Sequence, residues 1–304
     1  MILIDKINRY ISNKISNKLT KNNDELLLLI GKSVSMNVKN QKNVTNLEQI
    51  EFKVFSQYGD DGIIQWLINN IEIENKTFIE FGVSDYNESN TKFLLMNNNW
   101  SGFILDGSMK NINTIINSDY YWKYDLEAKC EFIDCDNIND ILALSSFNQN
   151  IGILHIDLDG NDYWVLKKII NINPEILILE YNSVFGYEKA ITVPYDKLFD
   201  RTEKHFSNLY FGASLPALRD LCNSNGYTFI GCNSAGNNAY FIRNDKINST
   251  ELEKIVANAI FISSKFRENR GPDGKLFYIN NKERQNIIKG LPVFNTRTNL
   301  LENL

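Results

Sequence analysis

Between residues 55 and 245, short apolar runs alternate with segments whose apolar residues recur at helical spacing. Short continuous apolar runs are typical of strands buried on both faces, and the periodic segments are typical of amphipathic helices. Their regular alternation predicts an α/β fold with a doubly wound, mostly parallel sheet. The expected strands are 77–83, 102–105, 131–133, 152–156 and 175–179, and the expected helices are 61–70, 89–98, 109–116, 138–145 and 162–170.

The alternation breaks at Tyr181–Phe211, a stretch rich in polar and aromatic residues. Long insertions after the carboxyl end of a strand hold substrate loops in such sheets, so we expect this one to cover a substrate. Ser214 and Gly226 then predict the start and end of a helix, and Thr228–Gly231 and Ala239–Arg243 predict a terminal hairpin. We therefore divide the chain into an N-terminal helical extension (1–50), a central domain (51–245) and a C-terminal extension (246–304).

Composition narrows the class of protein. The 304 residues are 43% apolar and 12% aromatic, as expected for a folded soluble protein, and a net charge of −5 argues against a nucleic-acid binder. Four cysteines without a CxxC pair predict reduced thiols and a cytoplasmic protein. We see neither a signal peptide nor a membrane span. Isoleucines at 2, 4, 7, 11 and 15 predict a helix that packs on the domain or on a second subunit of a homodimer, with a membrane surface as the alternative.

Candidate chemistry begins at Thr77–Asp85, where an apolar run ends on Glu80 and turns at Gly82. A second run, Gly102–Leu105, ends on Asp106. In an alternating β/α chain, a glycine turn after one strand and an acid after the next are typical of nucleoside binding. The glycine lets a ligand approach the backbone, and the carboxylate accepts both ribose hydroxyls.

Six segments in this order resemble the FkbM-like group of class I S-adenosylmethionine-dependent methyltransferases. They are Phe55–Gly62, Phe78–Gly82, Ile104–Ser108, Ile156–Tyr163, Leu179–Asn182 and Phe211–Leu215. The resemblance covers about residues 55 to 243 and implies a Rossmann-like sheet of seven strands with a terminal antiparallel hairpin. It leaves out the first fifty residues and the tail after Asp245.

The resemblance implies that the cofactor is S-adenosylmethionine, with Glu80 and Gly82 near its methionine half and Asp106 on its ribose. It places Gln57, Gly59 and Asp61 beside the amino-acid end. We also expect cofactor contacts from Ser84 and Asn90, and from Asp136 near the adenine, where Asp134 and Asn137 are alternatives and a turn or cap is equally expected. The family usually has a small residue or glycine at position 84 and often a further glycine. Here Tyr86 follows, which predicts a side chain over the cofactor or at its entrance.

The acidic run Asp157–Asp162 does not fit an EF-hand, because its glycine is in the fourth place and Lys168 stands in the twelfth. We expect Asp157 and Asp159 instead at the carboxyl end of the fourth parallel strand, with Glu180 and Asn182 ending the next. Similar sets in catechol-type methyltransferases bind Mg²⁺ or Mn²⁺. A metal held by Asp157, Asp159, Glu180 and Asn182 is therefore one interpretation, and a metal-free site that binds substrate hydroxyls is the other.

A hydroxyl acceptor needs a base or a metal to remove its proton, and the candidates for the base are Asp157, Asp159 and His205. His155 lies inside a predicted strand and is expected to be a satisfied core residue. An anionic acceptor oxygen would need only cations to position it, and Arg267, Arg270 and Lys275 of the tail are candidates.

The resemblance to enzymes of polysaccharide gene clusters predicts O-methylation of a sugar, or of a phosphorylated or nucleotide-linked precursor of a surface polysaccharide. Two other classes stay open. One is an NAD(P)- or nucleotide-sugar-binding enzyme, against which the chain lacks a GxGxxG after the first strand. The other is an inactive scaffold that only binds a partner.

Overall fold

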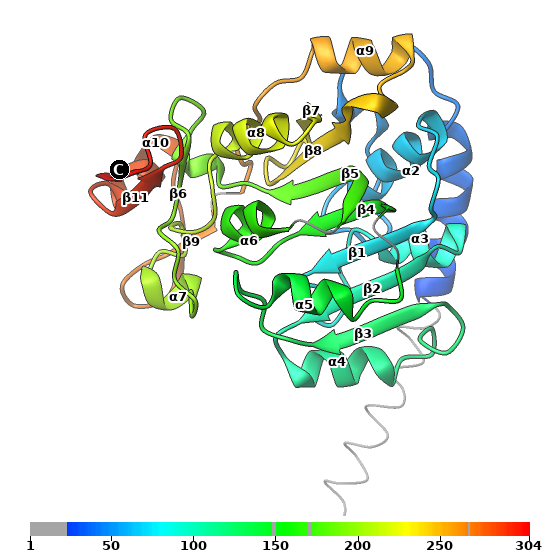
Figure 1. Cartoon of the computed structure of the whole chain (residues 1–304), viewed down its shortest axis with the longest axis horizontal. Helices are drawn as coiled ribbons and strands as arrows, with labels where there is room; N and C mark the ends of the chain where they lie inside the picture. The colour runs from blue at the N-terminus through cyan, green and yellow to red at the C-terminus, as the bar shows by residue number, and fades with distance from the viewer. Residues whose placement is uncertain (1–22, 148–149, 170–171, 267) are drawn as a thin grey trace, which may run out of the picture.

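The computed structural model describes residues 23–147, 150–169, 172–266 and 268–304. At its centre lies a seven-stranded sheet in the order β3-β2-β1-β4-β5-β8-β7 (Figure 1). The first five strands are parallel, and β8 runs antiparallel to both of its neighbours. The strands are β1 (Thr77–Phe81), β2 (Ser101–Asp106), β3 (Leu126–Cys130), β4 (Asn150–Ile156), β5 (Asn173–Glu180), β7 (Tyr227–Cys232) and β8 (Asn238–Arg243).

This sheet confirms the predicted fold class, including the hairpin of β7 and β8 that distinguishes the class I methyltransferase fold. Helices cover both faces. One face is covered by α2 (Asp60–Asn70), α3 (Lys92–Asn98), α4 (Met109–Ile116) and α9 (Thr250–Ala257). The other is covered by α5 (Ile138–Ala143), α6 (Asp162–Lys168) and α8 (Leu215–Ser224). Successive side chains of β1 alternate between these two cores: Phe78 packs into the first, and Ile79 and Phe81 into the second.

The third strand corrects the sequence prediction. It was expected at residues 131–133, but β3 occupies Leu126–Cys130, where Leu126 pairs with Gly102 and Cys130 pairs with Asp106. β3 is an edge strand and most of its side chains are half-buried, so it lacks the apolar run that marks a central strand. The apolar residues Phe132 and Ile133 lie past its end, beside a cavity described below.

The insertion and the C-terminal tail build one structure, which we call the cover (residues 181–211 and 259–304). The insertion contributes η2 (Ser183–Phe185), β6 (Ile191–Thr192) and α7 (Arg201–Lys204). The tail contributes β9 (Glu268–Arg270), β10 (Leu276–Tyr278), α10 (Asn281–Ile288), β11 (Pro292–Asn295) and β12 (Leu300–Asn303). β11 pairs with both β6 and β12, so the two stretches share a three-stranded sheet.

A small apolar core holds the cover together. Val184 and Ile191 of the insertion pack with Ile288 and Val293 of the tail. Figure 1 shows the cover at the carboxyl ends of the parallel strands, on the left of the molecule. In this fold, ligands bind at that edge of the sheet.

The N-terminal part that the structure describes is a helix over residues 23–38, preceding η1 (Leu47–Ile50). Leu28 packs in a cluster with Phe93 of α3, and Asp24 forms an ion pair with the buried Lys92 at 3.3 Å. This helix therefore packs on the domain. The isoleucines at 2–15 lie outside the described residues. Among the helices that the structure does describe, none has the length and apolar character needed to cross a membrane.

We predict that the cover core contributes measurably to stability. Ile288 is fully buried, so Ile288→Ala should lower the free energy of unfolding by about 2–5 kcal/mol. Leu301 of β12 is 67% exposed, so Leu301→Ala should change it by less than about 0.5 kcal/mol. Urea denaturation followed by tryptophan fluorescence measures both, and equal effects of the two changes would show that this core is not a packed unit.

Candidate active site at the carboxyl edge of the sheet

The turn after β1 depends on a close approach between two backbones. Gly82 has φ +74°, and a Cβ added there would lie 1.7 Å from the carbonyl oxygen of Asp157. Ser84 and Tyr86 also have left-handed backbones, with φ +49° and +61°. Left-handed geometry favours glycine, which explains why the resembling family uses small residues here. The turn therefore keeps its shape in this chain without the additional glycines.

Tyr86 corrects an expectation. Its side chain is fully buried in the first core, and its hydroxyl lies 2.8 Å from Thr91 Oγ1. It packs near Tyr120, with ring centroids 6.1 Å apart. It therefore neither leans over a ligand nor guards an entrance. The left-handed backbone at position 86 turns the side chain inward, which a sequence pattern cannot show.

Glu80 is the buried centre of the turn. Its Oε1 accepts the backbone N–H of Asn90 at 3.0 Å and lies 2.9 Å from His155 Nδ1. Its Oε2 accepts the hydroxyls of Ser89, at 2.7 Å, and of Thr91. Glu80 and His155 are register partners on β1 and β4, so the pairing of the strands places them together.

This pair has complementary charge. Burial alone would raise the pKa of Glu80 and lower that of His155, but their mutual hydrogen bond and attraction reverse both directions. The pKa of Glu80 is therefore lowered and that of His155 is raised. The other ring nitrogen of His155 lies 3.2 Å from Asn90 Nδ2, so both ring nitrogens have polar neighbours inside the sheet, as expected for a core residue.

Asp106 ends β2 and fixes the next turn. Its Oδ2 accepts the backbone N–H of Ser84 at 2.8 Å. Its Oδ1 accepts the N–H of Ser108 at 2.8 Å and the amide of Asn111 at 2.9 Å. Each carboxylate oxygen has two lone pairs, and three of these four are used, so the half-buried carboxylate keeps one acceptor position, on Oδ2, for a ligand hydroxyl.

The segment before α2 separates into residues that line a cavity and residues that hold the loop. Gln57 is exposed and lines a cavity. Asp61 is buried, and its Oδ2 accepts the backbone N–H groups of Val54, Phe55 and Ser56 at 2.7–2.8 Å. Gly59 precedes α2 and leaves no room for a side chain, since a Cβ would lie 2.6 Å from Glu51. Gly59 and Asp61, predicted to lie near a ligand, thus shape the loop that presents Gln57.

Two adjoining cavities lie along the strand ends. The first, about 250 Å³, is lined among others by Gln57, Glu80, Asn90 and His155. The second, about 260 Å³, is lined among others by Asp106, Phe132, Ile133 and Phe199. Gly82, Ser84 and Asp157 line both cavities, so the glycine turn lies where the two cavities adjoin. The predicted Glu80, Gly82, Ser84, Asn90 and Asp106 are therefore brought together along one elongated space.

Asp136 lies outside this set. Its side chain is 75% exposed and pairs with Lys197 at 3.2 Å, and it does not line the second cavity. Asp134 is buried and accepts the backbone N–H groups of Asp136 and Asn137, so it holds a turn. The side chains that do line the cavity here are Phe132 and Ile133, which the sequence analysis assigned to a strand.

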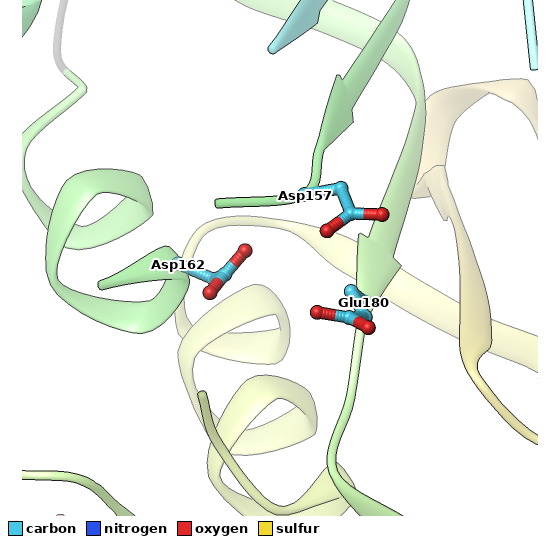
Figure 2. Close-up of side chains that lie close together, drawn as sticks. All are labelled: Asp157, Asp162 and Glu180. Carbon is cyan, nitrogen blue, oxygen red and sulfur yellow. The ribbon is translucent and has the colours of Figure 1, made fainter. Parts of the chain in front are cut away.

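Three carboxylates meet beside Gly82. Asp157 follows β4, Asp162 begins α6 and Glu180 ends β5, and their oxygens lie within 4.8 Å of one another. Figure 2 shows the three side chains pointing toward a common point. Asp162 accepts the backbone N–H groups of Leu158 at 2.7 Å and Gly160 at 3.0 Å, which explains its position. Glu180 Oε2 is buried without a hydrogen-bond partner among the described residues.

Crowding and burial make these carboxyl groups weak acids. Burial, reinforced by the charge of Asp159, raises the pKa of Asp157 to about 7. Burial raises the pKa of Asp162 to about 6 despite its backbone hydrogen bonds. Burial and the neighbouring carboxylates raise the pKa of Glu180 well above its usual range. The cluster thus holds protons near neutral pH, where ordinary carboxylates do not.

The remaining predicted residues have other contacts. Asp159 is largely exposed and forms an ion pair with Arg201 at 2.6 Å. The Asn182 amide donates to the carbonyls of Leu209 and Phe211 at 2.9 Å, and its Oδ1 accepts the N–H of Val184. His205 Nδ1 lies 2.7 Å from Ser207 Oγ, and His205 lines neither of these two cavities nor the third cavity described in the next paragraph. Within the described residues, the cluster contains Asp162 where Asn182 was expected.

A third cavity, about 150 Å³, lies between the strand ends and the cover. It shares Gln57 with the first cavity, and Glu180 is the member of the carboxylate cluster that lies in its wall. Sequence reasoning missed Arg201, Asn269 and Arg284, which line it. They come from α7, β9 and α10, in the insertion and in the unmatched tail. The only sequence signal was the basic character of the tail, which pointed to Arg270 of this wall but not to Asn269 or Arg284.

No protein-family model and no curated protein match the sequence. Similar solved structures include the N-terminal domain of EvdMO1 in the presence of SAH and D-fucose, at 11% identity and a TM-score of 0.39, over 69% of this chain and 94% of that one. A methyltransferase from Clostridium acetobutylicum is 11% identical, with a TM-score of 0.38, over 60% and 89%. The bifunctional kinase-methyltransferase WbdD is 11% identical, with a TM-score of 0.35; the match covers 55% of this chain and 34% of WbdD. The sheet order of the chain itself remains the basis of the fold assignment.

The carboxylate cluster predicts a specific pH dependence of stability. A raised folded-state pKa means that the folded protein binds the proton more tightly than the unfolded chain does. Stability is then fully present below about pH 4 and is lost as the pH rises to the folded pKa of Asp157, about 7. Asp157→Asn should therefore raise the unfolding temperature at pH 8, by at least about 2 °C, and leave it nearly unchanged at pH 4.

Asp273, which is 60% exposed and pairs with Lys275, supplies the matched control. Asp273→Asn should not reproduce this pH-dependent gain. Scanning fluorimetry from pH 4 to pH 9 measures both variants. An equal effect of Asp157→Asn at both ends of the range would contradict the raised pKa.

Proposed function

We propose that this protein is an S-adenosylmethionine-dependent O-methyltransferase. The observation that carries the proposal is the pair of adjoining cavities along the strand ends, with Glu80 and Asn90 in the first, Asp106 in the second and Gly82 in both. An elongated nucleoside ligand with an amino-acid end fits such a space. Asp106 would accept one ribose hydroxyl, and Phe132 and Ile133 would pack on the base.

The residues of the first cavity suit the methionine half of that cofactor. Gln57 and Asn90 offer polar groups, and Asp157 borders both cavities, next to the place where a cationic sulfonium is expected. The cofactor supplies the methyl group on a positively charged sulfur. The protein then has to align the acceptor and take up its proton.

For the base we propose Asp157, because its pKa of about 7 is well matched to proton uptake near neutral pH. In this scheme the acceptor oxygen would give its proton to the Asp157 carboxylate as it takes up the methyl group that a bound cofactor would supply. Glu180, in the wall of the third cavity, would hold the acceptor hydroxyl. Asp159 is already paired with Arg201 and His205 lies away from the cavities, so neither is the base in this scheme.

A divalent metal is the second candidate for activating the hydroxyl. Asp157, Glu180 and Asp162 offer carboxylate oxygens close enough to share an ion, a donor set that Mg²⁺ or Mn²⁺ accepts. In this form of the proposal Asp162 takes the place of Asn182. The observation in its favour is the unpartnered oxygen of Glu180.

The acceptor that we propose is a sugar, or a phosphorylated or nucleotide-linked precursor of a surface polysaccharide. The resemblance of the motifs to polysaccharide-cluster enzymes supports it, and so does a third cavity bordered by polar side chains and by the stacked rings of Tyr58 and Phe266. An NAD(P)-binding enzyme with the same glycine turn is the competing function, and the binding experiment below separates the two.

We expect calorimetry to detect binding of S-adenosylhomocysteine and no binding of NAD⁺. Asp106→Asn should weaken the binding of S-adenosylhomocysteine about tenfold or more, because a charged acceptor of ligand hydrogen bonds becomes a neutral amide. Asp140→Asn, an exposed change on α5, should leave it unaltered. Tight NAD⁺ binding without S-adenosylhomocysteine binding would refute the methyltransferase proposal.

The base and the metal can be separated by chelation. With an accepted sugar, Asp157→Asn and Glu180→Gln should each lower turnover by about 10²-fold or more while sparing S-adenosylhomocysteine binding. Turnover that persists in EDTA supports Asp157 as the base. Turnover that EDTA abolishes and Mn²⁺ restores supports the metal. Full activity of both variants would remove the cluster from the mechanism.

A further inference from the structure

The third cavity has unusual walls. They contain polar side chains from three separate parts of the chain: Glu180 at the end of β5, Arg201 and Asn208 of the insertion, and Asn269 and Arg284 of the tail. Buried polar atoms in native proteins nearly always have hydrogen-bond partners. Here several buried atoms lack one among the described residues: Asn269 Nδ2 and Oδ1, Asn208 Oδ1, Arg284 Nε and Glu180 Oε2.

Asn269 is the clearest case. Its side chain is fully buried, at 0% exposure, and both ends of its amide are unpartnered within the described chain. An amide presents donors on one side and an acceptor on the other, so its missing partner must both accept and donate. A pair of hydroxyls on one ligand does this, whereas an apolar ligand would leave the desolvation cost uncompensated.

Arg284 indicates that a ligand of the third cavity would carry a negative charge. It is 6% exposed, and Nη1 donates to the carbonyl of Phe266 at 2.7 Å and to Asn281 Oδ1 at 3.0 Å. Both partners are neutral, and no carboxylate of the described residues lies within 4.0 Å of its guanidinium. A buried cation without a counter-ion is costly, and a bound anion would remove that cost.

The neighbouring charges do not compensate. Arg201, in the same wall, is already paired with Asp159. Burial lowers the pKa of Arg284, and the nearby charge of Arg201 lowers it further. Glu180, at the end of β5, has a carboxylate oxygen without a hydrogen-bond partner among the described residues. The cavity therefore has two arginines, Arg270 and Arg284, on the side of the tail and the Glu180 carboxyl group on the side of the sheet.

We propose that this cavity binds a hydroxylated acceptor that carries a phosphate-type anion, with the anion on Arg284, a pair of hydroxyls on Asn269 and a further hydroxyl at Glu180. The inference rests on the proposed function only for the statement that this last hydroxyl is methylated. It narrows the acceptor to the phosphorylated class and assigns its recognition to the C-terminal tail.

The experiment uses the full-length protein and three probes: glucose, glucose 1-phosphate and inorganic phosphate. In calorimetry and thermal melting we expect glucose 1-phosphate to bind and to raise the unfolding temperature, inorganic phosphate to bind more weakly and glucose not to bind. Equal affinity for phosphate and glucose 1-phosphate would overturn the hydroxyl contacts of Asn269. Equal affinity for glucose and glucose 1-phosphate would overturn the anion site.

Two variants locate the contacts. Arg284→Gln should weaken glucose 1-phosphate binding about tenfold or more, since it removes the charge that faces the anion. Asn269→Asp should abolish that binding and raise the unfolding temperature of the ligand-free protein, because it places a carboxylate in the wall that contains Arg284. Arg297→Gln, a surface arginine paired with Asp220, is the control and should change neither quantity.

The two proposals fail separately. If S-adenosylhomocysteine binds and Arg284→Gln leaves glucose 1-phosphate binding unchanged, the anion site is wrong and the methyltransferase proposal stands. If S-adenosylhomocysteine does not bind while phosphate binding depends on Arg284, the methyltransferase proposal is wrong and the anion site stands. Should Arg284→Gln fail to fold, the comparison of the three probes on the wild-type protein still decides the question.

Discussion

The Glu80 carboxylate is buried where β1, β4 and the start of α3 meet, and the rest of the site is arranged around it. Backbone, hydroxyl and imidazole groups neutralise and orient it. Because these partners come from the loop at 89–91 and from His155, one buried charge fixes the loop to the sheet. The turn at Gly82 can then lie against the backbone of Asp157 without strain. Gly82 and Asp157 line both cavities at the strand ends, so this contact lies where the two cavities adjoin.

Much of the fold and part of this site could be predicted from sequence because the local signals are strong. Buried strands give apolar runs, and Gly82 and Asp106 stand at strand ends, where chain order alone determines their neighbours. β3 was misplaced because an edge strand carries no such run. Tyr86 was misassigned because its direction depends on a left-handed backbone, which is a property of the folded turn.

The insertion was expected to cover a substrate, but its pairing with the C-terminal tail could not be predicted, for a different reason. The sheet of the cover pairs Ile191 with Asn295, and the core of the cover joins Val184 to Val293. Neither contact leaves a periodic pattern in either segment alone. Asn269 and Arg284 reach the third cavity only because of this pairing. Each lies in a polar stretch of sequence that does not by itself predict a site. By contrast, Asp157 and Glu180 follow adjacent parallel strands, so their meeting was inferable, whereas Asp162 joined them through a tight turn at 158–162.

The way the cover is assembled also has a consequence for the order of folding. Thr296 donates to the carbonyl of Ala190 across 106 residues of chain, and other contacts of the cover span similar separations. Closing such long loops costs entropy before any contact compensates it, so these pairings form late. Four of the six strand pairings in the central sheet join residues closer in sequence, such as Thr77 with Ser101 and Asn150 with Asn173, so the sheet provides the surface on which the cover forms. During refolding, the central sheet should therefore become structured before the cover, and the cover should be the last part to acquire protection from hydrogen exchange.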